Sequence, residues 1–281
     1  QNGTRNMLML LAILCLPPTA ETAVPVHSHN DYWRSRPLQE ALEAGCLSIE
    51  ADVVARGGDL LVGHGAREVT ADRTLTSMYL SPLAEIVRAR QRVYPQDQRP
   101  LILLVDLKSS WTSTKPALKA VLEKYADILK APAGRHEGEG GILLAVSGSG
   151  ANKKESPCAI DGRISGLGSK QSFLEKPMIS QSFRSHFQWS GLGTLAFDQE
   201  AKLRTLAKQV KEEDRLLRLW AAPDTPEAWR TLLECGVGLI NTDQPTKAAE
   251  VVRAMMSPPD ELNEKNMATS ENVRHLDPSN P

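Results

Sequence analysis

The chain has 281 residues, of which 41% are hydrophobic and 24% charged, and its formal net charge at pH 7 is −1. This length and apolar content suffice for one large buried core, so a second domain is not required. A charge so close to zero gives no electrostatic basis for binding nucleic acid, which takes a concentrated basic face, or for attraction to an anionic membrane by bulk charge.

An apolar run at residues 7–16 follows Arg5 and precedes two prolines. This pattern is typical of the hydrophobic region of a signal peptide, and the run is too short to span a bilayer comfortably. We therefore expect residues 1–22 to be a signal-like or anchor segment, and the protein to be secreted or membrane-associated. The alternatives are the end of a longer anchor and a helix that covers the bottom of the folded part.

Apolar runs alternate with segments of helical periodicity between residues 23 and 256, which we expect to be a single domain. Strands are predicted at 23–28, 46–53, 101–107, 141–147, 159–165, 178–183, 215–221 and 237–242. Helices are predicted at 37–45, 80–92, 115–130, 197–212 and 225–235. This alternation implies parallel strands with right-handed crossovers, and eight such strands close a TIM (β/α)8 barrel in an α/β fold. An extra short strand near 59–63 makes the predicted barrel irregular, and the polar residues 257–281 predict a disordered tail.

Histidines and acidic residues fall at the ends of the first two predicted strands. Side chains alternate along a strand, so His27 and His29 share one face, as do Glu50 and Asp52. Two carboxylates pointing into one place require neutralisation, and hard cations such as Mg²⁺ or Ca²⁺ prefer carboxylate oxygens. The alternative is an exposed strand face on which these acids only maintain solubility.

The third predicted strand adds another acid and a base. The apolar run from residue 101 ends in Asp106 and Lys108, which lie two residues apart and so on the same face. Asp106 can complete a three-carboxylate metal site, and Lys108 can meet a phosphate as a point charge. A surface ion pair at the strand exit is the alternative. His64 follows the extra strand, close to the same strand ends.

These residues stand within the motifs HSHNDYWRSRPL, GCLSIEADV, LLVGH, ADRTL and VDLK. Together the motifs resemble the glycerophosphodiester phosphodiesterase and phosphatidylinositol phospholipase C-like superfamily, and they look closest to its branch called altered inheritance of mitochondria protein 6. The resemblance covers roughly residues 24–245 and implies a barrel of the phospholipase C-like phosphodiesterase type.

The resemblance implies roles for individual residues. The two superfamily histidines that act as general acid and base fall on His27 and His64, and the substrate-phosphate lysine falls on Lys108. A tryptophan near the end of the seventh strand falls on Trp220. The metal ligands of the superfamily fall on Glu50, Asp52 and Asp106.

One departure concerns the first histidine. Typical glycerophosphodiesterases follow it with arginine and glycine, whereas Ser28, His29 and Asn30 follow His27 here. His29 and Asn30 are the candidates to replace the missing phosphate-binding arginine, and a register shift of two residues would make His29 the catalytic histidine. Asn241, near the end of the last predicted strand, is a candidate to hydrogen-bond the catalytic histidine or a ligand.

The function predicted is metal-dependent hydrolysis of a phosphoric diester of the glycerophosphodiester or phospholipid type, with histidine acid–base catalysis. One divalent cation is expected, with Mg²⁺ favoured over Ca²⁺. The expected partner is a small-molecule or lipid phosphodiester; membrane-surface contact is expected through the N-terminal segment, and neither nucleic acid nor a protein partner is indicated. The alternatives are a noncatalytic barrel that binds phospholipid head groups and, less favoured, a zinc-dependent amidohydrolase, whose opening H-x-H is similar to HSHND.

Overall fold

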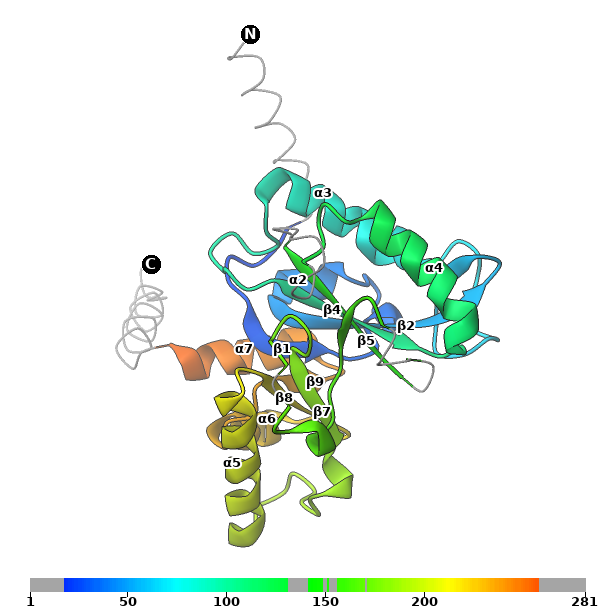
Figure 1. The fold of residues 1–281 in the computed structure, drawn as a ribbon. Helices are drawn as coiled ribbons and strands as arrows, with labels where there is room; N and C mark the ends of the chain where they lie inside the picture. Colours follow the sequence, from blue (N-terminus) through cyan, green and yellow to red (C-terminus); the bar gives the residue numbers. More distant parts are fainter. Residues whose placement is uncertain (1–17, 131–140, 149–150, 152–155, 170, 258–281) are drawn as a thin grey trace, which may run out of the picture.

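Parallel strands that follow one another in chain order form the centre of the molecule (Figure 1). The structure is a computed structural model, and it describes residues 18–130, 141–148, 151, 156–169 and 171–257. Within these residues the parallel strands are β1 (Val24–Ser28), β2 (Cys46–Arg56), β4 (Leu101–Leu107), β5 (Ile142–Ser147), β6 (Ala159–Ile160), β7 (Met178–Ser182), β8 (Leu216–Trp220) and β9 (Ile240–Thr242).

Hydrogen bonds close these strands into a barrel. Six of them pair in the order β6-β5-β4-β2-β1-β9, and β7 pairs with β8. Single parallel bridges join the two sheets, from Gly162 after β6 to Ile179 and from Arg218 to Leu239 before β9. The predicted eight-stranded TIM barrel is therefore confirmed, with two of its junctions reduced to a single bridge.

Helices follow most of the strands and pack outside the barrel. They are α2 (Gln39–Ala44), α3 (Ser81–Arg90), α4 (Trp111–Lys124), α5 (Phe197–Glu212), α6 (Pro226–Glu234) and α7 (Pro245–Met256). Local sequence fixes several starts: the Ser110 hydroxyl accepts a hydrogen bond from the Ser113 amide before α4, and Pro226 and Pro245 occupy first helical positions. Figure 1 shows α3 and α4 on the opposite side of the molecule from α5 and α6.

The barrel is irregular in two places. After β2 the chain turns back through Gly57 and Gly58, both at positive φ, into β3 (Asp59–Val62). This strand pairs antiparallel with the second half of β2 and lies close to the predicted extra strand at 59–63. The second irregularity is at β6, which spans two residues rather than the predicted 159–165; the only helix described between β6 and β7 is the short 3₁₀ turn Ile164–Gly166. The predicted helix 115–130 lies at Trp111–Lys124, and the last strand, predicted at 237–242, is Ile240–Thr242. The other predicted elements agree with the structure to within about three residues at each end, and α7 is an addition to them.

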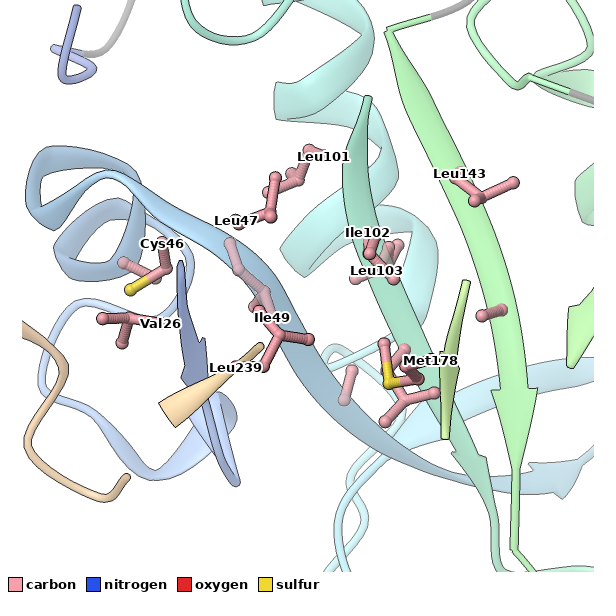
Figure 2. Close-up of a cluster of buried hydrophobic side chains, with 14 of the residues drawn as sticks. Val26, Cys46, Leu47, Ile49, Leu101, Ile102, Leu103, Leu143, Met178 and Leu239 are labelled. Atoms are coloured by element: carbon pink, nitrogen blue, oxygen red, sulfur yellow. The ribbon is translucent and has the colours of Figure 1, made fainter. Parts of the chain in front are cut away.

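The strand register places apolar side chains in the lower interior of the barrel and polar ones above them. Residues that pair across parallel strands point to the same face. Ser48 pairs with Ile102 near the start of the strands, and Asp52 pairs with Asp106 near their carboxyl ends, so both pairs point into the barrel at different depths. Ile102, Leu143 and Met178 are fully buried, and Figure 2 shows them within the apolar cluster. Each such side chain contributes about 1.5–3 kcal/mol through its burial.

The outer faces of the strands complete the core against the helices. Leu47, Ile49 and Leu103 alternate with the inward-facing residues and are also buried (Figure 2). Residues 1–17 of the predicted N-terminal segment and residues 258–281 of the predicted tail lie outside the described residues. In the part of the chain that is described, no helix is both long and apolar enough to cross a membrane.

Candidate active site

A pocket of about 430 Å³ opens at the carboxyl ends of the barrel strands. Residues at the ends of β1, β2, β4, β5, β6 and β8 form its walls, and His64 joins them from the loop after β3. Active sites of TIM barrels lie at this face, because loops after several strands converge there. The pocket is therefore where the chemistry of the predicted residues must be judged.

The three predicted metal ligands come together at this pocket, where Glu50 and Asp106 line the wall and Asp52 is buried beside them. Glu50, Asp52 and Asp106 each offer a carboxylate oxygen within 4.8 Å of the others. Lys108 lies between two of them, with Nζ 3.1 Å from Asp52 Oδ2 and 2.5 Å from Asp106 Oδ2. In this structure the Lys108 ammonium therefore supplies positive charge to the acidic cluster.

One carboxylate oxygen of the cluster is left without a partner. Asp52 Oδ2 accepts a hydrogen bond of 2.8 Å from the Tyr32 hydroxyl, whereas Asp52 Oδ1 is buried and has no hydrogen-bond partner among the described residues. Burial, reinforced by the charge of Glu50, raises the pKa of Asp52. A buried carboxylate oxygen in this situation is costly unless a cation or donor meets it. The donor set therefore fits a hard divalent cation.

Neighbouring residues hold Asp106 in place. The Ser147 hydroxyl donates a 2.8 Å hydrogen bond to Asp106 Oδ1. Gly148 follows at a φ of 88°, and a Cβ there would lie 2.3 Å from the same Asp106 oxygen. Only glycine allows the chain to pass so close to the carboxylate in this backbone conformation.

Glu50 reaches one level deeper into the barrel, where a buried network surrounds it. Its Oε2 lies 2.9 Å from His27 Nε2 and 2.8 Å from Arg218 Nη2, and Arg218 Nε donates to Asn241 Oδ1 at 2.8 Å. Burial alone would raise the pKa of Glu50, but Arg218 and His27 hold it well below its usual range. Glu50 is therefore ionised and fixed in position.

The structure does not place His27 where its predicted catalytic role requires. His27 is fully buried, both ring nitrogens are engaged, with Nδ1 2.8 Å from Ser48 Oγ, and it does not line the pocket. Burial, followed by the charge of Arg218, lowers its pKa to about 3, so the ring is neutral at pH 7. His27 supports Glu50, and the histidine of the same strand face that reaches the pocket is His29.

His29 has the environment of an acid–base residue. It lines the pocket, and its Nδ1 lies 2.9 Å from Asp243 Oδ1, which leaves Nε2 as the nitrogen available to a ligand. Burial opposes protonation of the ring, but the hydrogen bond to Asp243 and the charge of Glu50 outweigh it and raise the pKa of His29. Arg34 anchors this arrangement, with Nη2 3.5 Å from the same Asp243 oxygen. The two-residue shift considered from the sequence is therefore favoured by the structure.

The other predicted residues lie around the pocket mouth. His64 is solvent-exposed and lines the pocket, with its ring centroid 6.4 Å from that of Trp33. The predicted Trp220 also lines the pocket and is 41% exposed. Trp33, which was not predicted, lines it as well and is 60% exposed. Asn30 lines the pocket too, with its Oδ1 3.2 Å from the Tyr32 hydroxyl that donates to Asp52. The predicted candidate Asn241 lies deeper, as the partner of Arg218.

Six residues that line the pocket were absent from the prediction, namely Trp33, Ser147, Gly148, Asp161, Arg163 and Arg218. Arg218 stands two residues before Trp220 in an apolar strand, so alternation along β8 would have placed both on the inner face. Asp161 and Arg163 line the wall after β6 and form an ion pair with a nitrogen–oxygen distance of 2.8 Å. The sequence carried no comparable signal for these two, because β6 is too short to show a pattern.

Comparisons with known proteins identify the family. A family model described as the AIM6-like phosphodiesterase domain matches residues 19–152, which include His29, the three acids, His64 and Lys108. The altered inheritance of mitochondria protein 6 homolog of Arthroderma benhamiae is 30% identical over 263 residues, covering 78% of this chain and 81% of the relative. The chain belongs to the altered inheritance of mitochondria protein 6 family.

Further comparisons connect this family with a known fold. The Eremothecium gossypii altered inheritance of mitochondria protein 6 is 26% identical over 271 residues, covering 78% of the chain and 67% of the relative. A glycerophosphodiester phosphodiesterase from Parabacteroides distasonis superposes with a TM-score of 0.50 at 14% identity, covering 85% of the chain and 100% of that structure. A calcium-dependent phosphoinositol-specific phospholipase C from a Pseudomonas species gives 0.53 at 14% identity, covering 82% and 94%. This member of the family has the barrel of the phospholipase C-like phosphodiesterases.

Proposed function

We propose that the protein is a metal-dependent phosphoric diester hydrolase. The observation that carries the proposal is the cluster of Glu50, Asp52 and Asp106. Asp52 Oδ1 is buried in this cluster without a hydrogen-bond partner among the described residues, and Glu50 and Asp106 line one pocket with His29 and His64. Mg²⁺ is the favoured cation and Ca²⁺ the alternative, because both prefer carboxylate oxygens. The membership of a phosphodiesterase domain family supports the same reaction class.

Each residue of the site has a separate role in the proposed hydrolysis. A divalent cation held by the three acids would supply polarisation of a nonbridging phosphoryl oxygen. Lys108 stabilises the negative charge that develops on the phosphoryl group, because its ammonium already lies at the edge of the acidic cluster. His29 and His64 divide the proton transfers, one activating the nucleophile and the other protonating the leaving alkoxide.

The proposed substrate is a glycerophosphodiester or a phospholipid-type diester. The exposed rings of Trp33 and Trp220 at the pocket mouth support this, because aromatic side chains pack against organic groups while remaining partly in water. A zinc amidohydrolase is disfavoured, since the metal-type cluster found among the described residues contains carboxylates and no imidazole.

The test is hydrolysis of bis(p-nitrophenyl) phosphate by the purified chain, first with EDTA and then with Mg²⁺, Ca²⁺ or Zn²⁺ restored. Activity that returns with Mg²⁺ or Ca²⁺ and is lost in His29→Ala and Asp106→Ala is the expected result. His186→Ala is the matched control, because His186 lies outside this pocket. Folded protein that cleaves neither this compound nor lipid phosphodiesters with any of the metals would contradict the proposal and favour a noncatalytic head-group-binding barrel.

We also propose that the protein is exported or anchored to a membrane. The apolar run at residues 7–16, after Arg5, supports this location. Fractionation of cells that express the full chain tests it, and recovery of the intact chain from the cytosol alone would contradict it.

A further inference from the structure

The chain enters the barrel at the amino-terminal ends of the strands, on the face opposite the pocket. Residues 18–23, here called the entry segment, precede β1 and are fixed to this face by hydrogen bonds. The amide of Ala20 donates to the carbonyl of Leu42 at 2.9 Å, and Arg90 Nη1 donates to Thr19 Oγ1 at 3.2 Å. The apolar run at residues 7–16 therefore joins the folded part at the amino-terminal face of the barrel.

The last turn of α7 lies beside the entry segment. A Cβ on Gly45 would be 2.7 Å from Arg253 Nη2 and 2.9 Å from the carbonyl oxygen of Thr22, so the two elements meet at this glycine. Met255 and Met256 end the helix and are 37% and 62% exposed. They extend an apolar surface from the point at which the apolar run joins the barrel.

Arginines surround the same point. Arg90 donates to Thr19, and Arg253 Nη2 donates to the carbonyl of Ala44 at 2.7 Å, so both guanidinium groups hydrogen-bond to neutral oxygens. Glu21 is the one acid in the entry segment. Arginine side chains next to an apolar segment lie along apolar surface with their charged heads in the polar layer, where anionic lipids attract them. The near-zero net charge of the whole chain does not reveal this local arrangement.

The connection between the apolar run and the barrel is too short to let the barrel turn over. Only two prolines separate residue 16 from Thr19, and three residue steps reach at most about 11 Å. Cys46 pairs with Val24 at the amino-terminal ends, and Asp52 stands six residues further along β2. This distance is about 20 Å along the strand and about 16 Å along the barrel axis. The pocket therefore opens well away from any bilayer that holds the run.

We propose that the amino-terminal face of the barrel lies against a lipid bilayer, so that the pocket opens into the aqueous phase and does not receive lipids of the anchoring membrane. The inference rests on the proposed anchoring through residues 7–16 and, for the substrate, on the proposed function. A phospholipid keeps its phosphate in the head-group layer, on the far side of the barrel from the acids. Among the substrate types proposed above, this orientation favours a diester that is dissolved in water.

Quenching of a fluorophore by lipid reports the orientation without requiring turnover. The full chain with Cys15→Ala would carry the fluorophore on Met256→Cys or, as the matched control, on Leu192→Cys, which is 82% exposed in the loop after β7. The cysteines of the described residues are buried. In vesicles of phosphatidylcholine and phosphatidylglycerol, brominated lipid should quench the fluorophore at position 256 and not the one at position 192. Equal quenching, stronger quenching at 192, or no binding to the vesicles would overturn the inference.

Hydrolysis separates the inference from the proposed function. Phospholipids with one head group would be compared, with short acyl chains in solution or with long chains in the vesicle that holds the protein. We expect the soluble compound to be hydrolysed at least about 100-fold faster at equal concentration, because the phosphate of the embedded lipid does not reach the reacting position. Equal rates would overturn the inference. No turnover of any diester, with the quenching pattern intact, would overturn the proposed function and retain the orientation.

Discussion

Replacement of Lys108 by methionine is expected to tighten metal binding while weakening the metal-free protein. The Lys108 ammonium contacts both Asp52 and Asp106, so it lies where a divalent cation would draw on the same two carboxylates. Methionine keeps a similar length and removes the charge. The metal-free variant then has three neighbouring carboxylates with no ammonium between them, whereas an arriving cation no longer meets a like charge.

The size of both effects follows from the distances. Two unit charges about 4 Å apart interact by about 4 kcal/mol at an effective dielectric constant of about 20, and the cost of desolvating the ammonium offsets part of this. The Lys108 side chain is 22% exposed, so water screens it only in part. We expect the metal-free variant to lose about 1–3 kcal/mol of unfolding free energy, and its affinity for Mg²⁺ or Ca²⁺ to rise by about 10- to 100-fold.

Calorimetric titration with Mg²⁺ and Ca²⁺, together with urea unfolding in EDTA, measures both quantities. Lys119→Met is the matched control, because Lys119 is 72% exposed on α4 and its ion-pair partner is Glu123 rather than an acid of the cluster. A metal affinity within twofold of wild type in Lys108→Met would refute the idea that the ammonium and the cation compete. An unchanged unfolding free energy in EDTA would refute its role in compensating the acids.

Further predictions concern the histidines. His29→Ala should lower kcat by at least about 100-fold with little change in stability. His27→Gln should instead lower the unfolding free energy by about 1–3 kcal/mol. If kinetics and urea unfolding gave the reverse pattern, the catalytic role would belong to His27. Asp243→Asn should lower the pKa of His29. The part of the pH–rate profile that reports the ionisation of His29 should then move to lower pH. If it does not move, that part of the profile reports another group. The pKa of His27 is about 3 in the folded protein and 6.5 in the unfolded chain, so unfolding between pH 3 and 6.5 takes up a proton. The unfolding free energy should therefore rise with pH in this range by about 1.4 kcal/mol per pH unit. The slope should be smaller in His27→Gln.

The period of two along the strands was enough to bring the acidic cluster together. Glu50, Asp52 and Asp106 were assigned to one place because each stands on the inner face near a strand end, and their pairing in register across β2 and β4 confirms that they share one level or adjacent levels. The strand order was also readable, because alternating strands and helices leave few topologies.

The sequence did not predict how deep along the barrel axis each of these side chains lies. His27 and His29 share a face, so alternation cannot say which of them reaches the opening. The answer depends on the register of β1 against β2, which pairs His27 with Ser48 and shifts between Val24 and His27. Such a shift depends on three-dimensional pairing rather than on local sequence. Asp161 was missed for a related reason, since β6, which it follows, is only two residues long.

The charges at the pocket balance when a divalent cation and a phosphodiester are both bound. Four carboxylates face three permanent cations among the described residues, namely Glu50, Asp52, Asp106 and Asp161 against Lys108, Arg163 and Arg218. One net negative charge remains while the histidines are neutral. A divalent cation together with a singly charged phosphodiester brings the total to zero, and a charge buried without compensation would be costly.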